Sequence, residues 1–141
     1  MSRIFFDTNL FIYLLEDIGQ RGEQVSRLLE RIILRRDELV TSALTLGEVL
    51  VKPLLAGDLA WADRYEKLLS TPGMSVLPFD KGAARIYAQL RRDKTLKPPD
   101  AIQLACAGAA RCDLFVTNDD SLREKIVPGI QFIASLDQAF V

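Results

Sequence analysis

Four acidic residues of this chain each stand where an apolar run meets a polar turn. The first of these joins is Ile4-Phe5-Phe6-Asp7, which continues as Thr8-Asn9. Carboxylates brought together repel one another, and a divalent cation that prefers oxygen ligands removes that conflict. Such an ion polarises a phosphoryl oxygen and lowers the pKa of the water that it binds. The acids predicted to meet around a metal ion are Asp7, Glu48, Asp100 and Asp119.

The absence of histidine from the sequence narrows the chemistry further. Without histidine there is no Ser-His-Asp or Cys-His nucleophilic site, no paired-histidine acid–base cleavage, and no use of the commonest zinc ligand. The sequence also contains neither a Gly-x-Gly-x-x-Gly fingerprint nor a Walker phosphate loop. If the chain is an enzyme, its carboxylates must therefore do the catalytic work.

The composition is typical of a globular domain with a substantial core, since 49% of the 141 residues are hydrophobic and 26% are charged. We expect one domain, residues 1–141.

A formal net charge of -1 argues against binding nucleic acid through bulk charge, but it allows a local basic patch. Cys106 and Cys112 have neither disulfide nor zinc spacing, as in a reducing cytosol. With no apolar run of ~20 residues and no signal-peptide pattern, we expect a cytoplasmic protein without a membrane partner.

Strand-like and helix-like segments alternate along the chain. Short apolar runs predict strands at residues 4–6, 39–42, 74–77, 114–116 and 131–133. Between them, apolar residues recur at helical spacing over residues 10–15, 25–33, 45–50, 58–69, 83–90 and 101–110. This alternation predicts an α/β fold, a three-layer α/β/α sandwich with a mainly parallel five-stranded sheet.

Topology explains how acids so far apart in sequence could meet. Asp7 and Asp119 follow strands, whereas Glu48 and Asp100 lie in the first turns of helices, and such helices begin at the edge where the strands end. Structural roles compete with this interpretation. Glu48 stands three residues after Thr45, the spacing of a capping box, and Asp100 could be an ordinary N-cap. Pro53 is predicted to interrupt or kink the helix that carries Glu48.

Four segments of the chain resemble, in order, the motifs of PIN-domain ribonucleases. They are Ile4-Phe5-Phe6-Asp7-Thr8-Asn9-Leu10, the segment Thr41 to Leu50 around Glu48, Pro99-Asp100-Ala101-Ile102-Gln103-Leu104-Ala105, and Phe115-Val116-Thr117-Asn118-Asp119. The length of the chain is similar to that of VapC-type toxins of toxin–antitoxin pairs. The resemblance implies Mg²⁺- or Mn²⁺-dependent cleavage of RNA phosphodiesters that leaves a 5′-phosphate and a 3′-hydroxyl. It also implies a homodimer, and a cognate antitoxin protein whose C-terminal segment covers the site, often with an arginine among the acids.

Carried over to this sequence, the resemblance assigns a role to each motif residue. It implies that Asp7, Glu48, Asp100 and Asp119 are both the metal ligands and the catalytic residues. Thr8, Asn9 and Thr117 would orient these carboxylates. Asp120 has no counterpart in the family's motifs, and it could be either a surface acid or an auxiliary ligand. The basic residues that precede Asp100 lead toward the site, and the candidates for RNA contact among them are Arg91, Arg92, Lys94 and Lys97.

Three functional hypotheses follow. The first is a metal-dependent endoribonuclease that acts as the toxin of a toxin–antitoxin pair. The second is a catalytically idle module that binds RNA or a protein partner through the same edge. The third is an aspartyl phosphotransferase with Asp7 as nucleophile, which usually has a second aspartate two residues on, where this chain has Asn9. Arg27 and Arg31 could contact phosphate, or form a solvated helix face with a Glu23–Arg27 pair.

Overall fold

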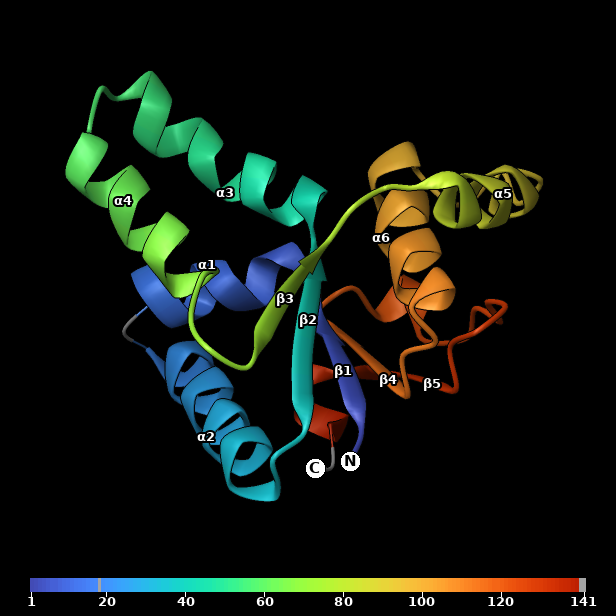
Figure 1. The fold of residues 1–141 in the computed structure, drawn as a ribbon, viewed down its shortest axis with the longest axis horizontal. Helices are drawn as coiled ribbons and strands as arrows, with labels where there is room; N and C mark the ends of the chain where they lie inside the picture. Colours follow the sequence, from blue (N-terminus) through green and yellow to red (C-terminus); the bar gives the residue numbers. More distant parts are fainter. Residues whose placement is uncertain (18, 140–141) are drawn as a thin grey trace.

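Five parallel strands form a single sheet in the computed structural model, which describes residues 1–17 and 19–139. Every neighbouring pair of strands is parallel, and their order is β3-β2-β1-β4-β5 (Figure 1). The predicted five-stranded sheet is therefore confirmed, with the last strand starting one residue later and ending two residues later than expected. The strands are β1 Arg3–Phe6, β2 Glu38–Ser42, β3 Met74–Leu77, β4 Leu114–Thr117 and β5 Phe132–Ser135.

Helices cover both faces of the sheet, as the three-layer prediction requires. Apolar residues of α1 to α4 pack with Ile4 and Phe6 on one face, and those of α5 and α6 pack with Phe5 on the other. In Figure 1 these two groups lie on opposite sides of the strands. The helices are α1 Thr8–Glu16, α2 Gln20–Arg35, α3 Ala43–Leu55, α4 Leu59–Leu68, α5 Lys81–Leu90 and α6 Pro98–Ala109, and the 3₁₀ turns are η1 Asp120–Leu122 and η2 Leu136–Gln138.

The central strand β1 is deeply buried and leads directly to one of the acids. Ile4, Phe5 and Phe6 are fully buried, because a parallel strand in the middle of a sandwich has both of its faces covered. Phe5 stacks on Phe115 of β4, with ring centroids 4.9 Å apart. This packing fixes where β1 ends, and the next residue along the chain is Asp7.

The predicted start of the helix that carries Glu48 is wrong, the predicted position of Asp100 in a first helical turn is confirmed, and Pro53 does not interrupt its helix. Ser42, at the end of β2, caps α3 by accepting a hydrogen bond from the Thr45 backbone N–H at 3.3 Å, so Thr45 lies inside the helix and forms no capping box with Glu48. The N-cap of α6 is Lys97, which places Asp100 in the first turn. Pro53 does not interrupt α3, which runs on to Leu55. Because α3 ends within two residues of Pro53, the missing N–H removes a bond only from its last turn.

Close packing holds α6 against the turn that precedes β5. A Cβ at Gly108 would lie 2.3 Å from the carbonyl oxygen of Pro128, so the backbone there would have to move. We expect Gly108→Ala to lower the free energy of unfolding by about 1–3 kcal/mol. Gly47→Ala in α3 is the matched control, because a Cβ there meets nothing within 4 Å. It should raise the free energy of unfolding by about 0.5–1 kcal/mol. Urea unfolding measures both, and an unchanged Gly108→Ala protein would contradict the close packing.

Candidate metal centre

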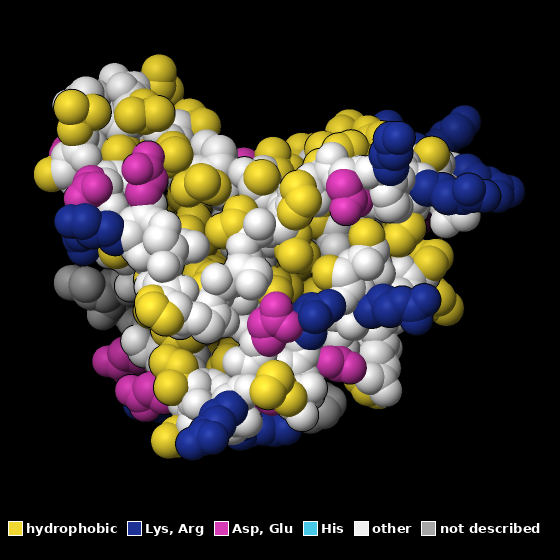
Figure 2. Space-filling view, in the orientation of Figure 1, with side chains coloured by type: hydrophobic (Ala, Val, Ile, Leu, Met, Phe, Trp, Pro, Cys, Tyr) yellow, Lys and Arg dark blue, Asp and Glu magenta, His cyan; other side chains and the backbone are white. Residues whose placement is uncertain are grey.

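All four predicted acids line one pocket, with a volume of about 270 Å³, at the carboxyl ends of the strands. Asp7 follows β1, Asp119 follows β4, Glu48 comes from α3 and Asp100 comes from α6. From β1, the chain adds β2 and β3 on one side of the sheet and then β4 and β5 on the other side. The boundary between β1 and β4 is therefore a topological switch point, where ligands of open α/β sheets bind. Figure 2 shows the surface hollowed between the α3–α4 and α5–α6 parts of the molecule.

Asp7 is held by hydrogen bonds to both carboxylate oxygens. Oδ1 accepts from the backbone N–H of Thr8 at 2.9 Å, which makes Asp7 the N-cap of α1, and Oδ2 accepts from Thr117 Oγ1 at 2.8 Å. Thr117 Oγ1 also accepts from the backbone N–H of Asp119 at 3.0 Å. Burial raises the pKa of Asp7 above its ordinary value, although the hydrogen bonds from Thr117, Thr8 and Gln103 act in the opposite direction. Asp7 is thus a fixed carboxylate whose charge is poorly solvated.

The other three acids differ in how they are held. Glu48 is exposed, and its Oε1 accepts from Thr8 Oγ1 at 2.6 Å. Asp119 caps η1, with Oδ1 accepting from the backbone N–H of Ser121 at 3.0 Å and from its hydroxyl at 2.6 Å. Among residues 1–17 and 19–139, no side-chain hydrogen bond reaches the carboxylate of Asp100. Its pKa is raised, first by burial and then by the charges of the other three acids, against a smaller opposing effect of Lys97.

This electrostatic coupling makes the pocket suitable for a cation. The charges of Asp7, Asp119 and Glu48 all raise the pKa of Asp100, so the four carboxylates interact, and every charged side chain lining the pocket is acidic. Across residues 1–17 and 19–139, no three histidine, cysteine or acidic side chains are placed so that together they could hold a metal ion. Oxygen donors around an open pocket fit Mg²⁺ or Mn²⁺, since Mg²⁺ keeps several waters and takes only one or two carboxylates directly.

Gln103 also lines the pocket, and no role is predicted for it from the sequence. Its side chain is buried, and its amide nitrogen lies 3.3 Å from Asp7 Oδ1, 3.1 Å from Thr8 Oγ1 and 2.7 Å from Thr45 Oγ1. A signal for it was present in the sequence. Gln103 is an amide one turn after Asp100, in a helix that is otherwise made of small and apolar residues at its buried positions.

Asn9 and Asp120, which are close to the acids in sequence, make no hydrogen bond to them in the described part of the chain. Asn9 is exposed and lines the pocket, but in the described part of the chain its side chain makes no hydrogen bond to the four acids. Asp120 is exposed, lies outside the pocket lining, and pairs with Arg123 at 3.7 Å. Of the three residues predicted to orient the acids, Thr8 and Thr117 therefore hydrogen-bond to them, whereas Asn9 does not within the described residues.

The predicted RNA-contacting residues fall into two groups. Arg91 donates to the backbone carbonyl of Leu96 at 2.6 Å and so helps to shape the loop before α6. Arg92, Lys94 and Lys97 are exposed, and Lys97 is close enough to lower the pKa of Asp100. On α2, Arg27 pairs with Glu23 at 3.8 Å, as in the solvated-face interpretation.

An ion pair and a hydrogen bond made by Lys125 hold the loop that leads to Asp100. Lys125 Nζ contacts Asp93 Oδ2 at 2.8 Å and donates to Thr95 Oγ1 at 2.6 Å. Lys125, followed by hydrogen bonds from Thr95, lowers the pKa of Asp93 to about 2. The loop therefore presents Lys94 and Lys97 from a fixed backbone.

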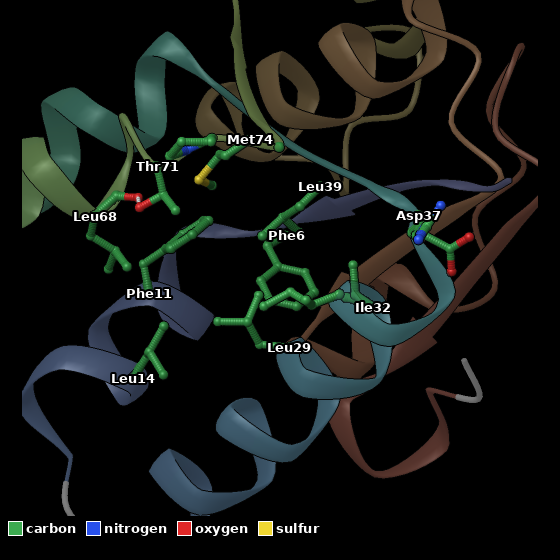
Figure 3. A pocket seen from close by; sticks show the side chains of 14 residues that line it. Phe6, Phe11, Leu14, Leu29, Ile32, Asp37, Leu39, Leu68, Thr71 and Met74 are labelled. Atoms are coloured by element: carbon green, nitrogen blue, oxygen red, sulfur yellow. Dashed lines mark hydrogen bonds between the residues drawn. The ribbon is translucent and has the colours of Figure 1, made fainter.

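A second pocket, with a volume of ≈ 330 Å³, lies on the α1–α2 face of the sheet and is mostly apolar. Figure 3 shows Phe6, Phe11, Leu29 and Met74 pointing into it, whereas the carboxylate of Asp37 points away. That carboxylate instead accepts from the backbone N–H of Ser2 at 2.8 Å and pairs with Arg35 at 3.4 Å. This pocket offers packing surface rather than catalytic groups.

None of the described helices is long and apolar enough to cross a membrane.

The raised pKa of Asp7 predicts a stability effect in metal-free protein. Below the ordinary value of 3.8, the carboxyl is protonated in both folded and unfolded chains. As the pH rises above 3.8, the unfolded chain ionises first, so wild-type stability falls until the pH passes the raised folded-state pKa. We expect Asp7→Asn in EDTA to be more stable than wild type at about pH 7 and equally stable at about pH 3. Urea unfolding at both pH values measures this, and a less stable variant at neutral pH would contradict it.

Comparison with known proteins places this chain in a family. A sequence model of the PIN domain matches residues 4–126, whereas no curated protein sequence matches. Among solved structures, the chain is similar to one from a toxin–antitoxin complex of Klebsiella pneumoniae, with 27% identity over 90% of this chain and 94% of that chain and a TM-score of 0.66. It is similar to a chain of DNA-bound VapBC from Salmonella typhimurium, with 26% identity, 96% and 99% coverage and a TM-score of 0.64.

A third structure shares the fold at lower identity. VapBC2 from Rickettsia felis, bound to a DNA fragment from its promoter, is 16% identical to this chain, with 94% and 98% coverage and a TM-score of 0.76. The region matched by the family model contains all four acids of the pocket. The family predicted from the four motifs is thereby confirmed, and this chain belongs to the PIN domain family.

Proposed function

We propose that this protein is a metal-dependent endoribonuclease and the toxin of a toxin–antitoxin pair. The observation that carries the proposal is the pocket in which four acids from four elements interact at the switch point of the sheet. Membership of the PIN domain family supports it. The chemistry needed is phosphodiester hydrolysis, which carboxylates and a divalent cation can perform without histidine.

In this proposal Asp7 and Asp100 hold Mg²⁺ or Mn²⁺, which when bound polarises the phosphoryl oxygen and lowers the pKa of its water. Asp7 is suited to this because Thr117 and Thr8 fix both of its oxygens. Asp100 is suited because burial and the neighbouring acids make its negative charge unfavourable until a cation is present. Asp119 and the exposed Glu48 orient the attacking water and accept its proton, and Thr8 directs Glu48 by donating to it.

The RNA backbone reaches the pocket along the loop before α6. The exposed residues Arg92, Lys94 and Lys97 contact its phosphates, because they are the basic side chains on the loop that leads into Asp100. The fixed loop, held by Lys125 on Asp93, keeps these cations in place. Phosphate contacts of this kind position the strand without reading its sequence.

The similarity to chains of toxin–antitoxin complexes supports an antitoxin as the protein partner. A cognate antitoxin covers the acid pocket, where a basic side chain can neutralise the carboxylates in place of the metal. The protein acts as a homodimer in the cytoplasm, and residues 1–141 form one nuclease domain.

The test is cleavage of labelled single-stranded RNA by the purified protein. We expect cleavage with Mg²⁺ or Mn²⁺, none with EDTA, and products that carry a 5′-phosphate and a 3′-hydroxyl. RNA left intact at every metal concentration would contradict the nuclease. If the uncut RNA were still bound, the idle RNA-binding module would be the better description.

A further inference from the structure

A network of buried polar side chains lies directly behind the acids. Its members are at most 8% exposed, although they sit between two apolar clusters. Buried hydroxyl and amide groups are stable only when hydrogen-bonded, so the directions of their bonds are constrained. The network connects the end of β2 and the start of α3 to the acid pocket through α6. Its residues are Thr8, Thr41, Ser42, Thr45, Gln103 and Thr117.

Gln103 is the centre of this network, and Ser42 sets its orientation. Ser42 Oγ hydrogen-bonds to Gln103 Oε1, which turns the amide nitrogen toward the pocket. The nitrogen then faces three oxygens, on Asp7, Thr8 and Thr45, at 3.3, 3.1 and 2.7 Å. A carboxylate can only accept hydrogen bonds, so the side of the amide next to Asp7 must be the donor side.

The orientation of Gln103 also determines what Thr8 can do. A threonine hydroxyl has one proton, and in the structure Thr8 donates it to Glu48 Oε1 at 2.6 Å while its oxygen accepts from Gln103. With the amide reversed, Oε1 would face Thr8 and compete with Glu48 for that proton. It would also bring a carbonyl oxygen against the Asp7 carboxylate. The orientation of this one amide therefore lets Gln103 donate to Asp7 and leaves Thr8 free to donate to Glu48.

We propose that Gln103 is a positioning residue that fixes Asp7 and Glu48 relative to each other for metal binding. This inference rests on the proposed function. Side chains that hold the ligands of a metal typically account for 10–100-fold of metal affinity or activity. A glutamine that merely fills the core would instead affect unfolding without changing how well the folded protein binds a metal.

The test is the dissociation constant of Mn²⁺, measured by electron paramagnetic resonance on the folded full chain. Gln103→Met keeps a long unbranched side chain and removes the donors, and we expect Mn²⁺ to bind about 10-fold more weakly or worse. Under saturating Mn²⁺, kcat for RNA should fall and KM should stay unchanged. Cys106→Ala, one turn further along α6 and outside the pocket lining, is the matched control and should bind Mn²⁺ as wild type does.

A second variant separates orientation from packing. In the part of the chain that the structure describes, Ser42 makes no hydrogen bond to the four acids, yet Ser42→Ala removes the donor that orients Gln103, together with the 3.3 Å cap of α3. We expect it to weaken Mn²⁺ binding in the same direction, which also decides the matter if Gln103→Met does not fold. Wild-type Mn²⁺ affinity in folded Gln103→Met, or in Ser42→Ala when Gln103→Met is unfolded, overturns the positioning role and leaves the proposed nuclease intact. A wild type that binds no Mn²⁺ overturns both.

Discussion

Asp7→Asn is expected to reduce kcat/KM for RNA cleavage at least about 100-fold, because loss of a ligand should exceed the typical effect of losing one of its supports. Asp7 is the acid most firmly fixed by the fold, since β1 ends at it and Thr8 and Thr117 bind its two oxygens. Asparagine retains the shape but supplies one neutral acceptor in place of a charged pair. The measurement is the initial rate on labelled RNA at saturating Mn²⁺.

The matched control for this loss is Asp120→Asn. Asp120 is a neighbour of Asp119 in sequence, but it is exposed and lies outside the pocket lining. It should retain the wild-type rate. Equal initial rates of RNA cleavage in Asp7→Asn and wild type would show that Asp7 has no part in catalysis. Taken with the expected gain in metal-free stability, a folded but inactive Asp7→Asn protein would separate the function of this carboxylate from any structural role.

Saturation with Mn²⁺ is expected to stabilise the wild type strongly. At a free concentration 100 times the dissociation constant, binding to the folded state alone adds ~2.7 kcal/mol. For a chain of this length, that is a rise in Tm of about 5–10 °C. The physical reason lies at Asp100, whose raised pKa reflects burial and the repulsion of three other acids that a cation would relieve. Thermal unfolding in EDTA and in increasing Mn²⁺ measures the effect.

Asp100→Asn should lose most of this response at the same Mn²⁺ concentration. Asp120→Asn should keep it, because the charge that it removes is outside the pocket. Comparing the two separates binding in the pocket from general screening of acidic groups by salt. A Tm that rises equally in Asp100→Asn and wild type would mean that Mn²⁺ stabilises the protein elsewhere.

The sequence was sufficient to predict the sheet and the meeting of the acids, because both depend on local patterns. Buried strands are continuous apolar runs such as Ile4-Phe5-Phe6, and a parallel sheet brings the residues after its strands to one edge. Asp7 and Asp119 follow from that rule. Glu48 and Asp100 follow as well, since helices that succeed strands begin at the same edge.

The sequence was not sufficient where two local partners compete. Both Ser42 and Thr45 could cap α3, and Ser42 does so because β2 ends there and places its hydroxyl one turn before the Thr45 N–H. The position of Gln103 in the apolar part of α6 marks it as unusual, but its role depends on Ser42, Thr8 and Thr45, which come from other elements. Exposure of Glu48 and Asn9 likewise depends on how α1 and α3 pack.

The most direct test of the metal centre is a crystal structure of the protein grown with Mn²⁺, with anomalous scattering measured at the manganese edge. A centre of this kind predicts an anomalous peak in the pocket, bonded to carboxylate oxygens of Asp7 and Asp100 at about 2.0–2.2 Å, as hard cations of this size require. Disappearance of the peak in Asp7→Asn crystals would agree with it. A pocket without a peak at saturating Mn²⁺ would contradict the metal centre and the nuclease built on it.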